Sequence, residues 1–210
     1  AVGAGGKVLD GNVNAGTTFA LGAGGIVSGT VTAGTTVALG ANSQVNETAP
    51  GTGGTVEAGT TVALGAGSSV AGNVTSTYST VTLGVGAHIK GATSAASAAT
   101  LGADAYTCGN VTAVTATLAA GAFVKGDVKA VTSTLSAKAF VTGNLGTGSP
   151  IIGITATLGA DACFGGVDVV TLTLGAGAGY CAAKPTSNSV TDTDNVLSAI
   201  TNAAILAKCN

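Results

Sequence analysis

The 210-residue sequence contains no arginine, no tryptophan and no methionine, and only 8% of its residues are charged. Proteins that bind nucleic acids cluster Lys and Arg to neutralise phosphates, and seven Lys against nine acidic residues cannot form such a surface. The sequence also lacks a run of about twenty apolar residues, the length that a helix needs to cross a bilayer. We therefore expect neither a nucleic-acid partner nor a membrane-spanning segment.

The absence of methionine includes the initiator, since the sequence opens with Ala1. This start is typical of a mature protein whose signal peptide has been removed. The sequence contains four cysteines, two of which, Cys181 and Cys209, bracket its last thirty residues. Paired cysteines of this kind favour an oxidising compartment, so we expect a secreted, extracellular protein.

The residues that are abundant form an internal repeat built around leucine. Successive leucines of a TLG-like segment are separated by 18, 25, 19, 18, 17, 17, 23 and 16 residues. The two long intervals contain inserts with Pro and Gly, near 47–53 and 146–152, which predict loops. The underlying period is therefore 17 to 18 residues. The reference leucines are Leu21, Leu39, Leu64, Leu83, Leu101, Leu118, Leu135, Leu158 and Leu174.

Small or apolar residues fall on every second position of this repeat, which is the alternation of a β-strand. Two positions after the leucine the residue is nearly always Ala, and we expect this column to line a narrow core. The residue eight positions after the leucine is usually Gly, which predicts a corner with a φ angle closed to other residues. These columns include Ala23, Ala41, Ala66, Ala103, Ala120, Ala137, Ala160 and Ala176, and Gly29, Gly72, Gly91, Gly109, Gly126 and Gly143.

A strand repeat of this length predicts an all-β protein, a single β-solenoid (β-helix) of about nine coils. We expect one domain over 1–210, with solenoid coils from 7 to 181, a linker over 182–191 and a C-terminal α-helix over 192–209. The segment GAFVKGDVKA at 121–130 resembles coils of the bactofilins. That resemblance implies a right-handed coil, and about three short strands in each coil imply a triangular cross-section.

One face of the predicted solenoid carries threonine pairs, three positions and one position before each leucine. The residue after the leucine is Gly, Ala or Ser, and none of these three outward columns contains a charge. Threonine favours strands by itself, but this preference does not explain why charges are excluded from one face only. The threonines are Thr18, Thr36, Thr61, Thr80, Thr82, Thr100, Thr115, Thr117, Thr132, Thr134, Thr155, Thr157, Thr171 and Thr173.

These regular Thr-x-Thr ladders resemble the flat β-solenoid faces of ice-binding (antifreeze) proteins. The resemblance implies that the fourteen threonines contact ice, that the partner is an ice crystal surface and that no cofactor is needed. Three early coils depart from the pattern with Ala20, Ala38 and Ala63, and Ala98 interrupts the other rank. The alternative is a self-assembling structural or cell-surface solenoid, like a bactofilin or an adhesin.

An enzyme is not expected. Asp104 and Asp161 share a column but lie three coils apart, too far for paired acid–base chemistry. His88 has no second His or Cys in register, so we expect no metal site.

The third face carries a row of residues five positions after the leucine: His88, Tyr106, Phe123, Phe140 and Cys163. An exposed aromatic row on a secreted monomer calls for a cover, and the predicted helix over 192–209 offers one. Its apolar stripe, from Val196 to Ala207, recurs at helical spacing. We therefore expect a monomer with the helix packed along this row.

The cysteines test this packing. Cys163 and Cys181 fall on consecutive coils, close enough to pair, whereas Cys108 lies three coils from Cys163. A helix of fifteen residues spans about 22 Å, which matches four coil spacings of about 4.8 Å. We therefore predict Cys108–Cys209 and Cys163–Cys181, with a local Cys181–Cys209 bridge as the rival.

Overall fold

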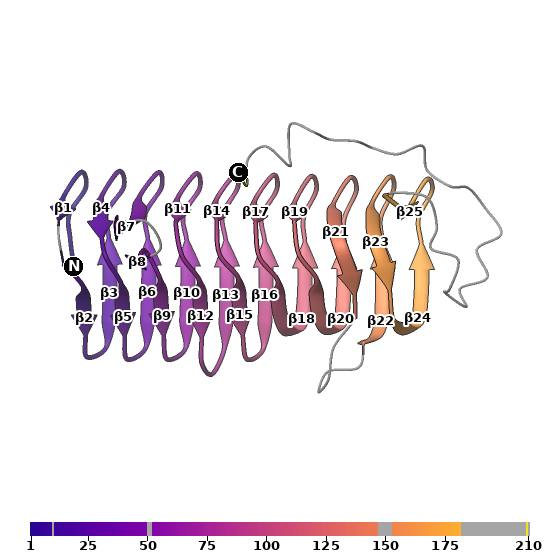
Figure 1. Ribbon diagram of the computed structural model, residues 1–210, viewed down its shortest axis with the longest axis horizontal. Helices are drawn as coiled ribbons and strands as arrows, with labels where there is room; N and C mark the ends of the chain where they lie inside the picture. The colour runs from indigo at the N-terminus through magenta and orange to yellow at the C-terminus, as the bar shows by residue number, and fades with distance from the viewer. Residues whose placement is uncertain (10, 50–51, 147–152, 182–208, 210) are drawn as a thin grey trace.

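The computed structural model describes residues 1–9, 11–49, 52–146, 153–181 and 209. This part of the chain winds into a single all-β solenoid of about nine turns, with the coils stacked side by side along one axis (Figure 1). It contains 25 strands and no helix. The helix predicted over 192–209 lies outside the described residues except for Cys209.

Three ladders of parallel strands run along the axis, and each ladder takes one segment from successive coils. The first contains the leucines and consists of β3 (Thr18–Leu21), β6 (Thr36–Leu39), β10 (Thr61–Leu64), β13 (Thr80–Leu83), β16 (Ala98–Leu101), β18 (Val111–Leu118), β20 (Val128–Leu135), β22 (Gly153–Leu158) and β24 (Val169–Leu174). The second consists of β1 (Lys7–Val8), β4 (Ile26–Ser28), β7 (Gln44–Ala49), β11 (Ser69–Val70), β14 (His88–Ile89), β17 (Tyr106–Thr107), β19 (Phe123–Val124), β21 (Phe140–Leu145), β23 (Cys163–Val167) and β25 (Gly179–Tyr180). The third begins with β2 (Val13–Ala15), β5 (Val31–Ala33), β9 (Val56–Ala58), β12 (Val74–Ser76) and β15 (Thr93–Ala95), and continues in the first halves of β18 and β20.

Strand pairing follows the sequence repeat column by column. Leu101 pairs with Leu118 and Leu118 with Leu135, so equivalent residues of neighbouring coils lie side by side. The β-solenoid prediction is confirmed. The coils begin earlier than the predicted position 7, because Val2 already forms a parallel bridge with Leu21.

The core is a narrow stack of aliphatic ladders. In the strands of the first ladder from β3 to β22 the leucine and the residue two positions before it are buried, as Val81 and Leu83 are, because alternate side chains of a strand point to opposite faces. In the last strand, β24, Leu172 and Leu174 are only partly buried. The residue six positions after the leucine closes the core from the second ladder. Its buried members are Val27, Val45, Val70, Ile89, Thr107, Val124, Val141, Phe164 and Tyr180.

The prediction that the alanine two positions after the leucine lines the core is wrong. Ala41 and Ala66 are exposed, as are most members of this column. The residue that follows this alanine has a positive φ, such as 55° at Asn42 and 65° at Gly67, so the chain turns here and alternation is interrupted. The small buried column lies two positions later, at Ser43, Ser68, Ala87, Ala105, Ala122, Ala139 and Ala162.

The glycines eight positions after the leucine are needed for a different reason from the one predicted. Of this column only Gly29 has a positive φ, 138°. A Cβ built on Gly126 would lie 2.2 Å from Oδ1 of Asn110 in the preceding coil, and that oxygen accepts a 2.8 Å hydrogen bond from the Asp127 amide. Close approach of stacked coils, rather than backbone conformation, therefore requires glycine at this corner.

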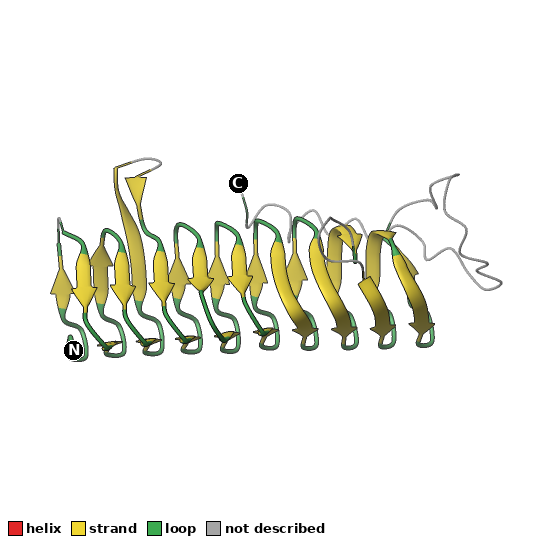
Figure 2. Cartoon of the chain, turned by 90° about the horizontal axis from the view of Figure 1, so that it is seen from below, coloured by secondary structure: helices red, strands yellow, loops and turns green. Residues whose placement is uncertain are grey.

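The insert in the first long interval forms a β-hairpin. Strand β7 pairs antiparallel with β8 (Thr52–Gly53), the one antiparallel pairing among the described strands. The hairpin stands out from the body of the solenoid (Figure 2). The insert near 146–152 lies almost entirely outside the described residues.

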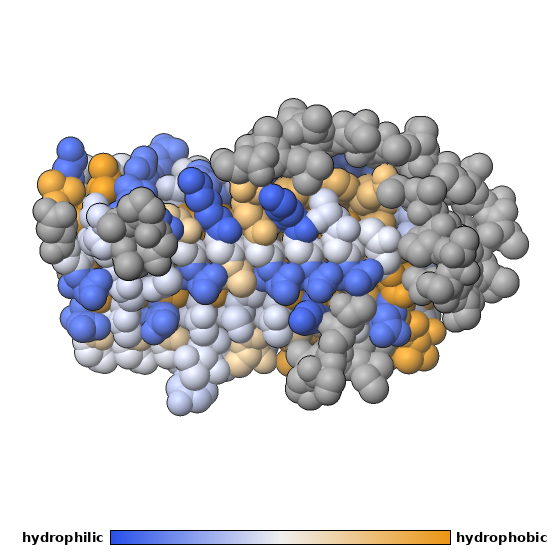
Figure 3. Space-filling model, in the orientation of Figure 1, coloured by the Kyte–Doolittle hydropathy of each residue, from blue (hydrophilic) through white to orange (hydrophobic). Residues whose placement is uncertain are grey.

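The third ladder carries the hydrophilic surface of the solenoid. Asn73, Thr75 and Lys129 lie on it, and Figure 3 shows hydrophilic side chains gathered in rows along this face. In the described part of the chain no helix is long and apolar enough to cross a membrane. The right-handed winding stays a prediction, because strand pairing defines neighbours but not the hand of the coil.

Candidate functional site

The first ladder presents two ranks of outward residues in register, which together with the small residue after each leucine we call the threonine face. The first rank lies three positions before the leucine. Its successive Cα partners are Thr18, Thr36, Thr61, Thr80, Ala98, Thr115, Thr132, Thr155 and Thr171. Eight of nine coils thus place a threonine in one line, which only Ala98 interrupts.

The second rank lies one position before the leucine and changes along the axis. Its successive partners are Ala20, Ala38, Ala63, Thr82, Thr100, Thr117, Thr134, Thr157 and Thr173. The structure therefore brings all fourteen predicted threonines onto one ladder, and complete pairs are confined to coils from Leu83 onward.

These side chains point away from the core. In β13, Thr80 is half-buried and Thr82 is exposed, whereas Val81 and Leu83 between and after them are buried. Neighbouring threonines of one rank lie about 4.8 Å apart along the axis and the two ranks about 6.8 Å apart along the strand. Because threonine is branched at Cβ, its χ1 rotation is restricted, so the methyl and hydroxyl groups form a stiff two-dimensional array.

The position after each leucine carries a small residue, so no large side chain protrudes at this edge of the threonine face. A Cβ built on Gly65 would lie 2.6 Å from the carbonyl carbon of Gly40, which is closer than real contacts allow. Two later coils carry Ala119 and Ser136 here, which are still small. No charged residue occurs in any of the three columns, and the first charges beyond them are at the turn, at Asp104, Lys138 and Asp161.

Hydroxyl groups in the complete pairs have few partners within the protein. The hydroxyl of Thr155 donates to the hydroxyl of Thr132 at 3.4 Å. Within the described ranges, no other hydroxyl of the Thr-x-Thr pairs from Thr80 to Thr173 has a protein hydrogen bond. These groups are consequently free to bind water.

A further column borders the threonine face and was not singled out from the sequence. It lies one position before the first rank, at the corner towards the third ladder, and we call it the corner column. Its residues are Thr17, Thr35, Thr60, Ser79, Ser97, Val114, Val131, Ile154 and Val170. The signal that could have identified it is the change from hydroxyl-bearing to aliphatic residues at one fixed position of the repeat.

In the first coils the hydroxyls of the corner column are used internally. Thr35 donates to the carbonyl oxygen of Thr17 at 2.9 Å, and Thr60 donates to that of Thr35 at 3.0 Å. Each hydroxyl therefore ties its coil to the preceding one. The hydroxyls of Thr18 and Thr35 also lie 3.3 Å apart.

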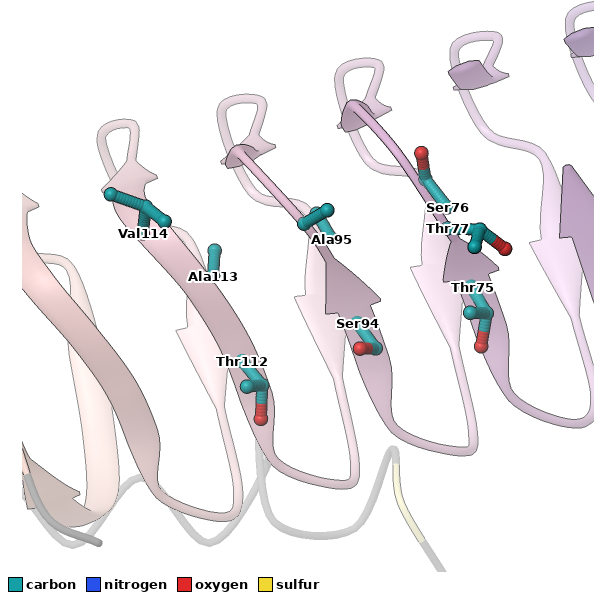
Figure 4. Close-up of a pocket in the computed structure, with 9 residues that line it drawn as sticks. Thr75, Ser76, Thr77, Ser94, Ala95, Thr112, Ala113 and Val114 are labelled. Carbon is teal, nitrogen blue, oxygen red and sulfur yellow. The ribbon is translucent and has the colours of Figure 1, made fainter. Parts of the chain in front are cut away.

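The corner changes shape in the middle of the solenoid. Thr77, Tyr78 and Ser79 form it in one coil, Ala96 and Ser97 in the next, and Val114 alone in the third. This step leaves a hollow of about 340 Å³ beside Thr75, Ser94 and Thr112, which lie on the same side of three neighbouring strands (Figure 4). Tyr78 projects from the corner with 77% of its surface exposed.

The aromatic row on the second ladder is largely covered. Phe123 and Phe140 stack with ring centroids 5.0 Å apart, and both are buried with Cys163 in a cluster that Tyr106 and Cys209 border. Burial raises the pKa of the Tyr106 hydroxyl above its ordinary value. The row is thus a packing surface in the described part of the chain. Its first member, His88, stacks on Tyr106 at 4.9 Å.

Two disulfides lie beside this row, Cys108–Cys209 and Cys163–Cys181, with Cα–Cα distances of 5.5 and 5.0 Å. They are the pairings that the coil spacing predicts, and the rival Cys181–Cys209 bridge is absent. Disulfides persist under oxidising conditions, so the two bridges indicate an oxidising environment.

Ligands for a metal ion are not gathered anywhere in the described ranges: no three His, Cys, Asp or Glu residues lie close enough together to hold one. Asp104 and Asp161 are exposed at turns, with φ angles of 56° and 57°. Comparison of the chain with protein-family models, with curated proteins and with solved structures finds no match.

Proposed function

We propose that this protein is an extracellular ice-binding (antifreeze) protein that adsorbs to ice through the threonine face. The observation that carries the proposal is the pair of in-register ranks: the first has a threonine in eight of nine coils, and the second has one in every coil from Leu83 onward. A crystal surface is itself periodic in two dimensions, and a periodic array is the arrangement that can meet it at many points at once.

The composition of the face suits ordered water. Apolar groups restrict the orientation of the water next to them, and each threonine methyl lies beside a hydroxyl that can hydrogen-bond that water. Charges would hold water in their own hydration shells, and the three columns contain none. The face thus supports a layer of ordered water that merges with ice and stops local growth of the crystal.

In this mechanism the affinity for ice comes from the large number of contacts and from the rigidity of the threonine array. Single contacts between water and a methyl or hydroxyl group are weak, but their sum is large when all are made together. The array is held by the strand ladder and by restricted χ1 rotation, so little conformational entropy is lost on adsorption. No cofactor, metal or catalytic group takes part in this proposal, and a monomer is sufficient.

Measurement of thermal hysteresis and ice-crystal shape in a nanolitre osmometer tests the proposal. The test variant is Thr134→Tyr, which places a bulky ring in the middle of the face. The matched control is Thr112→Tyr, because Thr112 is a half-buried outward threonine on the hydrophilic ladder. We expect shaped crystals and hysteresis from the wild type and the control, and little from Thr134→Tyr.

Two outcomes would overturn the proposal. The first is equal activity in both variants, whether high or low, because the face would then have no special part. The second is a wild type without hysteresis that forms filaments under the electron microscope, which would assign the chain to self-assembling structural solenoids.

A further inference from the structure

The corner column and the second rank change together along the axis. Coils with Ala in the second rank have Thr at the corner, as in Thr35 with Ala38, whereas the last four coils have an aliphatic corner and Thr in the second rank, as in Val131 with Thr134. The two coils between them have Ser at the corner and Thr in the second rank. The corner residue therefore varies with the composition of the threonine face.

Three of the four aliphatic corner residues are exposed, and the fourth is partly exposed. Val114 exposes 49%, Ile154 52% and Val170 76% of its surface, and Val131 is half-buried. In β18 the residues Val114 and Thr115 both point outward, one after the other, between buried Ala113 and Ala116. The valine thus borders the first rank directly and contributes nothing to the core.

Strand formation does not require an aliphatic residue here. The corner is continuous strand in β18, β20, β22 and β24, where any β-branched residue suits the backbone. Threonine is also β-branched and would avoid exposing four neighbouring apolar side chains to water. An exposed apolar patch on a soluble protein generally marks a binding surface.

We propose that Val114, Val131, Ile154 and Val170 form a third, apolar rank of the ice-contacting surface in the last four coils. The inference rests on the proposed function and names a part of the site that the threonine pattern does not include. The rank adds methyl groups beside the first threonine rank without adding hydroxyls. Its occupant is the same ordered water and ice surface that the adjoining ranks bind.

The test compares the pair Val114→Lys/Ile154→Lys with the pair Val114→Thr/Ile154→Thr. The lysines lie two coils apart, so they do not repel each other as neighbours. A charge at the contact with ordered water keeps its own hydration shell, and we expect the lysine pair to lose at least about half of the thermal hysteresis. The threonine pair keeps a methyl at each site and should retain most of it.

The control is Leu9→Lys, because Leu9 is 62% exposed and lies on the second ladder side, in the column that carries Lys90 and Lys125 in later coils. We expect this variant to match the wild type. Thr134→Tyr is measured in the same series, so that the two hypotheses are separated. Wild-type hysteresis in the lysine pair with loss in Thr134→Tyr would overturn the third rank and leave the proposed function standing.

Two additional outcomes also decide the question. If the lysine pair lowers the melting temperature measured by circular dichroism, the pair Val114→Ser/Ile154→Ser replaces it: lost hysteresis supports the rank, and full hysteresis overturns it. If the wild type sediments as a dimer that the lysine pair dissociates without loss of hysteresis, the aliphatic rank binds a second copy of the chain, and the proposal is wrong.

Discussion

In the coils of Leu21, Leu39 and Leu64 the second threonine lies at the corner, whereas from Leu83 onward it lies in the second rank. Both arrangements have two hydroxyl-bearing residues in nearly every coil, but they use them differently. The hydroxyls of Thr35 and Thr60 donate to backbone carbonyl groups of the preceding coil. Those of the complete pairs, apart from the bonded hydroxyls of Thr132 and Thr155, make no protein hydrogen bond in the described part of the chain.

The difference separates two tasks that threonine performs on one ladder. In the first three coils the corner hydroxyl stabilises stacking, and the face itself offers one threonine and one alanine per coil. In the described later coils no corner side chain bonds the preceding coil, and every coil except that of Leu101, which has Ala98, presents two threonines on the face. Under the proposed function, the later coils would provide most of the contact with ice.

The disulfides divide the molecule in the same way. Cys108, Cys163 and Cys181 all lie on coils from Leu101 onward, and Cys209 joins them there. The first coils share the aliphatic core and the hydrogen-bonded ladders, but they have corner hydroxyls in place of a disulfide. Two halves of one solenoid thus depend on different interactions for their stability.

The largest expected effect is a loss of stability in the later coils when the disulfides are reduced. Cys108 and Cys209 are 101 residues apart, and closing a loop of this size contributes about 4 to 5 kcal/mol in the chain-entropy model. Because solenoid coils contact only their neighbours, reduction should accelerate amide hydrogen exchange in the later coils and leave the coils of Leu21 to Leu64 nearly unchanged. Uniform acceleration along the chain would contradict this division.

The next effect concerns the position of a bulky substitution along the second rank. Thr134→Tyr should lower thermal hysteresis several-fold, because the ring holds the neighbouring threonines of the complete pairs away from ice, whereas Ala38→Tyr should have a clearly smaller effect. Both residues are half-buried members of the second rank, so the comparison isolates the coil in which the ring is placed. Equal losses would show that both halves bind ice alike.

An increase in thermal hysteresis is expected when threonine is added to the second rank in the first coils. The pair Ala38→Thr/Ala63→Thr extends the second threonine rank by two coils, and both positions point outward in strands that accept β-branched residues. Hysteresis should rise by up to about twofold, because weak contacts of a rigid array add together. A decrease, with an unchanged melting temperature, would argue that the first coils contribute through their flat alanine surface.

The smallest effect is expected from a substitution that should lower stability without changing ice binding. Thr35→Val removes a hydroxyl that donates to the Thr17 carbonyl group and keeps the shape of the side chain. The free energy of unfolding should fall by about 1 kcal/mol while hysteresis stays within error of the wild type. Thermal denaturation followed by circular dichroism and osmometry on the same samples give both values, and the opposite result would assign Thr35 to the contact surface.

Much of the fold was accessible from the sequence because the repeat is regular. The period, the outward direction of the threonines and the buried leucine column follow from strand alternation, and Leu101, Leu118 and Leu135 align as the repeat requires. The two disulfide pairings could be predicted as well, since coil spacing excludes a direct bridge between Cys108 and Cys163.

Strand alternation gave a wrong prediction for the alanine column, because the chain turns at this position. Ala41 has the parity of a core residue but is exposed, because Asn42 adopts a positive φ and bends the backbone. Asn, Asp and Gly at this position were a usable signal for that turn. The role of Gly126 was harder to recognise, because the oxygen that excludes a side chain belongs to Asn110, sixteen residues earlier in the sequence and adjacent only after the coils stack.

That contact between stacked coils has a consequence for how such a chain can change in length. Asn110 accepts a hydrogen bond from the Asp127 amide, and Asp127 accepts one from the Asn144 amide, both through Oδ1. At this corner each coil donates a backbone N–H to a side-chain oxygen of the preceding coil. It also provides a side-chain oxygen that accepts the backbone N–H of the next coil. A whole coil can be copied or deleted between Asn110 and Asn144 without loss of this hydrogen bond, so the number of coils can change as long as this corner keeps an acceptor oxygen.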